Sequence, residues 1–174
     1  MFKTFYPDEY VASTYVLDFE KMYREGCRGL VFDIDNTLVP HGAAADEAAI
    51  QLFARIHHLG MKTMLVSNNG EARVKPFAQQ VQTDYIYKAG KPKVEGYNKA
   101  MAKMGTDPKH TLFIGDQIFT DILGANLCGM RSVLLDPLSP DPSATVRFKR
   151  SLEGFLRPHY TRLTAGEETV KSKA

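Results

Sequence analysis

Five short apolar segments, each followed by a longer stretch of mixed polarity, constrain the fold of this chain more than any other feature. The apolar segments are nearly continuous rather than alternating, which is typical of parallel strands covered by helices on both faces. A repeated strand–helix–strand order gives a mostly parallel sheet with right-handed crossovers. We therefore expect a three-layer α/β/α Rossmann-like fold with about five strands, at residues 29–35, 62–68, 84–89, 110–116 and 131–136.

The stretches between these strands have helical spacing. In residues 45–60 the apolar side chains fall on one stripe, and Gly60 is suited to the helix end. Residues 91–105 carry a proline near the start and a glycine at the end, which is the usual asymmetry of a helix. Residues 71–81 are a weaker helix, because Pro76 is expected to kink or delay it. Residues 120–130 form a short helix interrupted by glycines.

Length and composition indicate one globular domain. The chain has 174 residues, 44% of them hydrophobic, and a formal net charge of +2, which is too small to argue for nucleic acid. It contains no run of about 18 apolar residues and no signal-peptide pattern, so we expect a cytoplasmic protein. We divide it into an N-terminal segment packed on the core (1–28), the core (29–140) and a basic amphipathic segment with a polar tail (141–174). That last segment fits an anionic membrane surface, although a helix docked on the core or on a second subunit of a homo-oligomer is favoured.

Polar side chains gather where the predicted strands end. Asp33 and Asp35 follow the first strand, Ser67, Asn68 and Asn69 the second, and Asp116 the fourth, while Lys88 and Lys91 follow the third. The carboxyl ends of parallel strands meet at one edge of a sheet, where ligands bind. We therefore expect these side chains to form one site.

The residue types of this site suit phosphoryl transfer. Two adjacent carboxylates cost free energy unless a cation offsets their repulsion, and Asp33, Asp35, Asp116 and Asp121 supply the hard oxygens that Mg²⁺ prefers. Ser67, the backbone amide of Asn68 and one lysine are donors suited to phosphoryl oxygens. One carboxylate can attack phosphorus while a second, two residues on, protonates the leaving group.

Four motifs in this order resemble the haloacid dehalogenase-like (HAD) phosphohydrolases. They are "DIDNTL", "VSNN", "KAGKP" and "GDQIFTD". The wider stretches "SNNGEARV" and "GDQIFTDILGANLCGMRSVLLDP", with the N-terminal "FYPDEYVASTYVLD", are similar to the YqeG-type branch, subfamily IIIA. That branch is related to phosphatases acting on phosphatidylglycerophosphate, which makes this lipid a candidate substrate.

The resemblance implies a role for each matching residue. Asp33 would be the nucleophile, Asp35 the general acid and base, and Lys91 the residue that steadies phosphate and nucleophile. Thr37 would support the loop and Ser67 would bind a phosphoryl oxygen. Magnesium would contact the Asp33 carboxylate, the Asp35 backbone carbonyl and Asp116. Asp121 would either be a further ligand or support the ligands without contacting the ion.

Several alternatives stay open on the sequence alone. Arg73 is either a contact for a second substrate anion or a solvated helix arginine, and Asn69 either orients substrate or caps the next helix, with capping favoured. Lys88 competes with Lys91, and the motif favours Lys91. The intervals between motifs leave no room for a cap domain, so we expect an open site and a large or lipid substrate. A regulatory or scaffold protein that keeps the fold is the alternative function.

Overall fold

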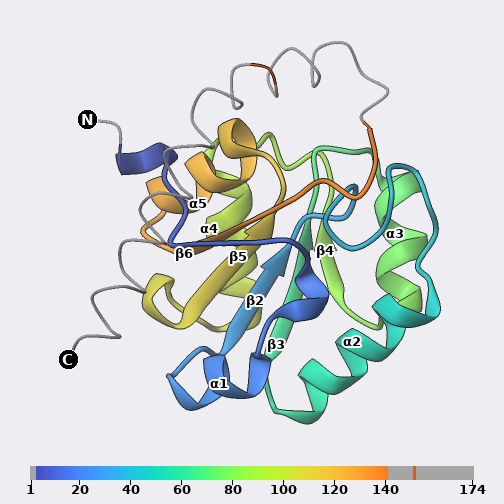
Figure 1. Ribbon diagram of the computed structural model, residues 1–174, viewed down its shortest axis with the longest axis horizontal. Helices are drawn as coiled ribbons and strands as arrows, with labels where there is room; N and C mark the ends of the chain where they lie inside the picture. Colours follow the sequence, from blue (N-terminus) through green and yellow to red (C-terminus); the bar gives the residue numbers. More distant parts are fainter. Residues whose placement is uncertain (1–2, 141–150, 152–174) are drawn as a thin grey trace.

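A six-stranded parallel sheet forms the centre of the molecule (Figure 1). The structure is a computed structural model that describes residues 3–140 and residue 151. The strand order is β1-β6-β5-β2-β3-β4, and every neighbouring pair is parallel. The strands are β1 (Glu9–Val11), β2 (Gly29–Phe32), β3 (Lys62–Val66), β4 (Asp84–Ile86), β5 (Thr111–Gly115) and β6 (Arg131–Leu135).

The five predicted strands are confirmed, and the sheet has one strand more than the expected number. Strand β1 lies at an edge of the sheet and pairs only with β6, with Glu9 opposite Val133. Its three residues are all partly exposed, so they lack the apolar run by which the other strands were recognised. A short edge strand of this kind leaves little signal in a sequence.

Helices cover both faces of the sheet and complete the three layers. The α-helices are α1 (Phe19–Arg24), α2 (Glu47–His58), α3 (Glu71–Gln80), α4 (Val94–Met104) and α5 (Leu123–Leu127). Short 3₁₀ turns occur at η1 (Lys3–Phe5), η2 (Thr14–Val16) and η3 (Pro108–His110), and a π-helical turn, η4 (Ile118–Ile122), precedes α5.

Alternate residues of each central strand point to different helical layers. Leu30 and Phe32 of β2 pack with the apolar residues of α1, α2 and α3. Val31, between them, packs instead with the apolar residues of α4 and α5. Burial of both faces explains why these strands read as continuous apolar runs, and it fixes the register that presents the polar residues at the sheet's carboxyl edge.

The helix ends agree with the sequence at two glycines and differ at one proline. Gly60 follows α2 and Gly105 ends α4, both with positive φ, as expected of helix-terminating glycines. Helix α3 begins at Glu71 and continues through Pro76, so the prediction that proline would delay it was wrong. Buried contacts of Val74, Phe77 and Ala78 hold this helix on the sheet despite the missing N–H.

The expected basic amphipathic segment at 141–174 lies outside the described residues, apart from Ser151. Within the described ranges, none of the helices combines the length and apolar character needed to cross a bilayer.

Candidate active site

The predicted site residues meet at the carboxyl edge of the sheet, beginning with the loop after β2. The backbone N–H of Asp33 donates to the Ile114 carbonyl (3.1 Å), which extends the pairing with β5 by one residue. The chain then turns at Asn36, whose φ is 63°, and Asp35 forms a bridge with Val39. This tight turn places Asp33 and Asp35 above the ends of the central strands.

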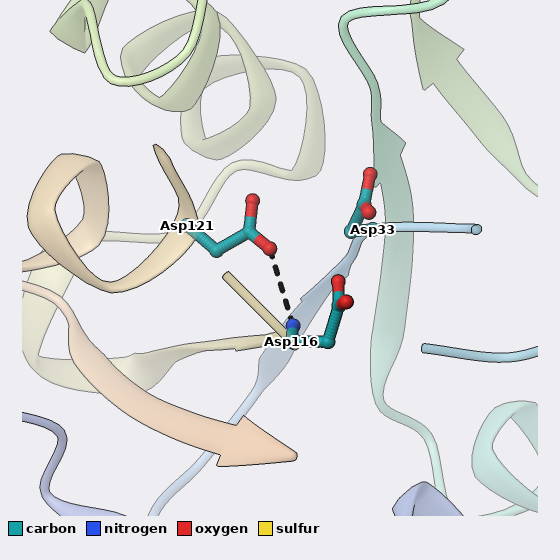
Figure 2. A group of neighbouring side chains, drawn as sticks. All are labelled: Asp33, Asp116 and Asp121. Atoms are coloured by element: carbon teal, nitrogen blue, oxygen red, sulfur yellow. Dashed lines mark hydrogen bonds between the residues drawn. The ribbon is translucent and has the colours of Figure 1, made fainter. Parts of the chain in front are cut away.

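Three carboxylates converge beside this loop. Asp33, Asp116 and Asp121 each offer an oxygen such that these atoms lie within 4.8 Å of one another. Figure 2 shows the three side chains around one space, with Asp33 following β2 and Asp116 following β5. We call these three residues the acidic cluster. All three are buried, Asp116 and Asp121 completely.

Lys91 joins two members of the acidic cluster. Its ammonium group lies 2.8 Å from Asp33 Oδ1 and 2.7 Å from Asp121 Oδ1. The Lys91 side chain is only 3% exposed, so these pairs form largely out of water. Of the two lysines weighed on the sequence, Lys91 is therefore the one in the site, while Lys88 is exposed.

The carboxylate of Asp121 is held mainly by the protein. Its Oδ2 accepts from the backbone N–H groups of Asp116 (3.2 Å) and Gln117 (3.1 Å), and its Oδ1 accepts from Lys91. Figure 2 marks the bond to the Asp116 amide. Because its oxygens are already engaged, Asp121 is better suited to organising the cluster than to supplying a primary metal ligand.

Close packing fixes the turn that carries Asp121. A Cβ at Gly115 would overlap the Asp121 carboxylate, so only glycine allows β5 to approach it. The buried Tyr97 hydroxyl of α4 donates to the Thr120 carbonyl of η4 (2.7 Å). The Tyr97 ring in turn fills the space that a side chain at Gly124 would occupy.

Asp35 points to different partners. Its Oδ1 accepts from Arg73 Nη2 and from the Gly42 backbone N–H, both at 2.8 Å, and its Oδ2 accepts from the Asn69 amide (2.6 Å). We call Asp35, Asn69 and Arg73 the Asp35 group. The N-cap of α3 is Gly70, so the expectation that Asn69 caps this helix was wrong. The Asn69 side-chain amide donates to Asp35 instead.

Ser67, Asn68 and Thr37 support the loops around the cluster. The buried Ser67 hydroxyl accepts from the Asn69 backbone N–H (3.2 Å). The Asn68 side chain bonds both backbone groups of Lys91, accepting at 2.7 Å and donating at 3.2 Å, and so fixes that residue's loop. The Thr37 hydroxyl donates to Asp116 Oδ1 at 3.4 Å.

The two aspartates after β2 differ in acidity. Burial raises the pKa of Asp33 to about 6, although the Lys91 charge opposes the shift. Burial also acts to raise the pKa of Asp35, but hydrogen bonds from Arg73 and Gly42 and the Arg73 charge outweigh it and hold that pKa below its usual value. Burial opposes the charge of Lys91, but Asp121 and Asp33 raise the pKa of its ammonium group above the ordinary range.

The cluster fits a hard divalent cation. Its carboxylates are close enough to share one ion, and the raised pKa of Asp33 shows that Lys91 alone does not offset the cost of its burial. Buried carboxylate oxygens beside a buried lysine suit Mg²⁺. The motif residues thus meet at one edge of a parallel sheet, which is the arrangement expected of the HAD-like class.

Comparison with known proteins agrees with that class. Residues 88–137 match the HAD-hydrolase-like family model. The chain is 36% identical over 152 residues to Probable phosphatase YqeG of Bacillus subtilis (strain 168), covering 87% of this chain and 88% of the relative. The chain therefore belongs to the YqeG-type branch of the HAD-like phosphatases.

More distant relatives share only a part of the chain or only the fold. A stretch of 67 residues is 46% identical to the Xenopus laevis phospholysine phosphohistidine inorganic pyrophosphate phosphatase, covering 38% of this chain and 25% of that protein. A Xanthomonas campestris hypothetical protein aligns with a TM-score of 0.54 at 18% identity, covering 71% of this chain and 72% of the other. A Streptomyces avermitilis protein described as a HAD family hydrolase aligns at 0.50 and 14% identity, with coverages of 63% and 72%.

Sequence reasoning missed the residues that position the site without belonging to a motif. Gly42 donates its backbone N–H to Asp35, and Tyr97 holds the turn before Asp121. Tyr97 lies on the apolar stripe of α4 and is indistinguishable there from a core residue, so its hydroxyl bond had no signal. The glycine before Asp116 was visible in the fourth motif, but its closeness to Asp121 was not.

Proposed function

We propose that this protein is a Mg²⁺-dependent phosphomonoester hydrolase that works through an aspartyl-phosphate formed on Asp33. The observation that carries the proposal is the acidic cluster, in which three buried carboxylates lie within 4.8 Å of one another with Lys91 bonded to two of them. Such a concentration of negative charge is costly unless it serves to hold a cation.

Asp33, Asp116 and the backbone carbonyl of Asp35 are the proposed Mg²⁺ contacts, with Asp121 holding Lys91 and the loop behind them. A bound Mg²⁺ ion would neutralise charge on the cluster and on the substrate phosphoryl group, so that an anionic nucleophile is not repelled. The engaged oxygens of Asp121 support this division of roles.

Asp33 is the proposed nucleophile because it follows the central strand and lies against Lys91. Attack by its carboxylate on phosphorus forms the Asp33–phosphorus bond and breaks the bond to the leaving alkoxide. Lys91, the Ser67 hydroxyl and the Asn68 backbone N–H are the proposed contacts for the phosphoryl oxygens. Asp35 enters the first step protonated and gives its proton to the leaving oxygen; the resulting carboxylate then takes a proton from the water that attacks the aspartyl-phosphate, which releases phosphate and the Asp33 carboxylate.

The lack of a cap domain between the motifs supports a large substrate. Residues 36–66 hold only α2 and β3 beyond the loop, and residues 68–90 hold only α3 and β4, so neither interval contains a cap domain. A small metabolite would be poorly enclosed at such a site. A phosphate on a lipid headgroup, with phosphatidylglycerophosphate as the first candidate, is the substrate class we propose, together with peripheral contact with a membrane.

Hydrolysis of an aryl phosphate tests the proposal. Wild-type protein should turn over substrate only with Mg²⁺, and Asp33→Asn should lower kcat by roughly 10⁴-fold or more because the nucleophile is lost. The exposed Asp84, at the start of β4, gives the matched control Asp84→Asn, which should keep full activity. Turnover indifferent to chelator and to Asp33→Asn would overturn the proposed mechanism, and absence of Mg²⁺-dependent turnover would favour the regulatory or scaffold alternative. A panel of phosphorylated lipids and metabolites then ranks substrates.

A further inference from the structure

The guanidinium group of Arg73 is only partly used in the structure. Its Nη2 donates to Asp35 Oδ1 at 2.8 Å, the one ion pair described for this side chain. Among the described residues, Arg73 Nε is the buried side-chain nitrogen or oxygen atom that has no hydrogen-bond partner. An arginine beside a carboxylate commonly donates two parallel hydrogen bonds, so this pairing leaves half of the fork without an acceptor.

Asp35 has hydrogen-bond donors other than Arg73. The Gly42 N–H and the Asn69 amide also donate to its carboxylate, at 2.8 Å and 2.6 Å. The loss of Arg73 would therefore leave Asp35 bonded on both oxygens, whereas the loss of Asp35 would leave the Arg73 charge without its ion-pair partner. The geometry thus makes Arg73 the more easily recruited member of the pair.

Arg73 is also reachable from outside. Its side chain is 22% exposed, against 3% for Lys91, and it lies in the first turn of α3, close to the loop that carries Ser67 and Asn68. Lys91 is already bonded to Asp33 and Asp121, so its charge is committed to the reacting end of the site. A second substrate anion that approaches the site from solvent would therefore reach Arg73 before Lys91.

We propose that Arg73 recognises a second anionic group of the substrate, next to the scissile phosphomonoester, by exchanging its bond to Asp35 for a two-point contact with that group. The exchange gives the guanidinium a second acceptor and leaves Asp35 Oδ1 with one donor, the Gly42 N–H, in place of two. Asp35 is the side chain that must face the leaving group. The substrate class is then a phosphomonoester with a neighbouring phosphodiester or carboxylate. This inference rests on the proposed phosphatase function.

Phosphonates test the exchange without turnover, because their P–C bond resists hydrolysis. The probes are propylphosphonate, 3-phosphonopropanoate, which adds a carboxylate, and the monomethyl ester of propane-1,3-bisphosphonate, which adds a phosphodiester-like anion. Calorimetry in the presence of Mg²⁺ should give a Kd at least about tenfold lower for one or both two-anion probes than for propylphosphonate. The reason is that a charge-assisted hydrogen bond from Arg73 replaces contacts with water. Comparing the two shows which anion is preferred.

Variants decide whether Arg73 causes the preference. Arg73→Gln should reduce the ratio of affinities to about one, and Arg73→Lys, which keeps the charge but loses the fork, should leave an intermediate ratio. Lys75→Gln removes an exposed charge from the same helix and should leave the ratio unchanged. Asp35→Asn removes the competing carboxylate, so the ratio should rise above that of the wild type.

Equal affinities for all three probes in the wild type would overturn the inference, as would an undiminished wild-type ratio in folded Arg73→Gln or Arg73→Lys. An Asp35→Asn ratio no higher than wild type would show that no exchange takes place. Failure of the phosphatase proposal looks different, because it appears as absent Mg²⁺-dependent turnover of aryl phosphate whatever the phosphonate affinities are.

Discussion

Two neighbouring parts of one site treat their carboxylates in opposite ways. In the acidic cluster, Asp33 shares one lysine with Asp121, and burial raises its pKa to about 6. In the Asp35 group, hydrogen bonds from Arg73 and Gly42 outweigh burial and lower the pKa of Asp35. In the metal-free protein these directions run against the proposed roles, because the nucleophile must be ionised and the general acid protonated. A cation on the cluster would lower the pKa of Asp33, and loss of the Arg73 bond would raise the pKa of Asp35. We therefore propose that the first region receives a cation and that the second holds one carboxylate until substrate binds.

The largest expected effects come from removing one carboxylate in each region, Asp33 or Asp35. Asp35→Asn should lower kcat/KM for alkyl phosphates by roughly 10²–10⁴-fold, since an alkoxide leaves poorly without a proton donor. The loss for an aryl phosphate should be much smaller, because its leaving group needs little protonation. Steady-state kinetics on both substrates measure the difference. Asp33→Asn should abolish turnover of both, and equal losses for the two substrates in Asp35→Asn would refute the proposed division of labour.

The next prediction compares the cationic side chains of the two regions, Lys91 and Arg73, each replaced by methionine. Lys91→Met leaves Asp33 and Asp121 buried without a partner charge and should destabilise the metal-free protein by about 3–5 kcal/mol. Arg73→Met should cost less, about 1–2 kcal/mol, because the Arg73 side chain is more exposed and Asp35 keeps two other donors. Urea unfolding in chelator measures both losses.

Added Mg²⁺ separates the two variants further. Because the ion binds the native acidic cluster, it should reduce the stability difference between Lys91→Met and the wild type. The difference between Arg73→Met and the wild type should stay unchanged. Equal destabilisation of the two variants, or an equal response to Mg²⁺, would show that the regions are not electrostatically distinct.

The sequence predicts two members of the acidic cluster because backbone topology brings them together. Parallel strands bring their carboxyl ends together, so Asp33 and Asp116, which follow β2 and β5, had to become neighbours. The Asp35 group was only half visible. Asn69 was expected to cap α3, but both it and Arg73 turn toward Asp35, and that choice depends on rotamers and on the Gly42 turn rather than on periodicity. The edge strand β1 was missed for a related reason, since three half-buried residues carry no pattern.

The smallest predicted effect concerns a residue that touches neither region's substrate contacts. Tyr97→Phe removes the hydroxyl that donates to the Thr120 carbonyl and leaves that buried acceptor without this donor. We expect a loss of about 0.5–1.5 kcal/mol in unfolding free energy, because the Thr120 carbonyl keeps the Leu123 backbone N–H as a donor. Tyr85→Phe removes a hydroxyl bonded to Glu71 near the surface and should cost little, which makes it the matched control.

Mg²⁺ affinity distinguishes a positioning role of Tyr97 from simple stabilisation. The turn η4 carries Asp121, which holds Lys91 and the Asp116 amide, so loosening it should weaken Mg²⁺ binding severalfold in calorimetry at a temperature where the variant is fully folded. The bonds of Asp35 do not pass through η4, so the phosphonate affinity ratio should stay at its wild-type value. Weakened Mg²⁺ binding with an unchanged ratio would show that the two regions respond independently, whereas a joint change would mean that they form one mechanical unit.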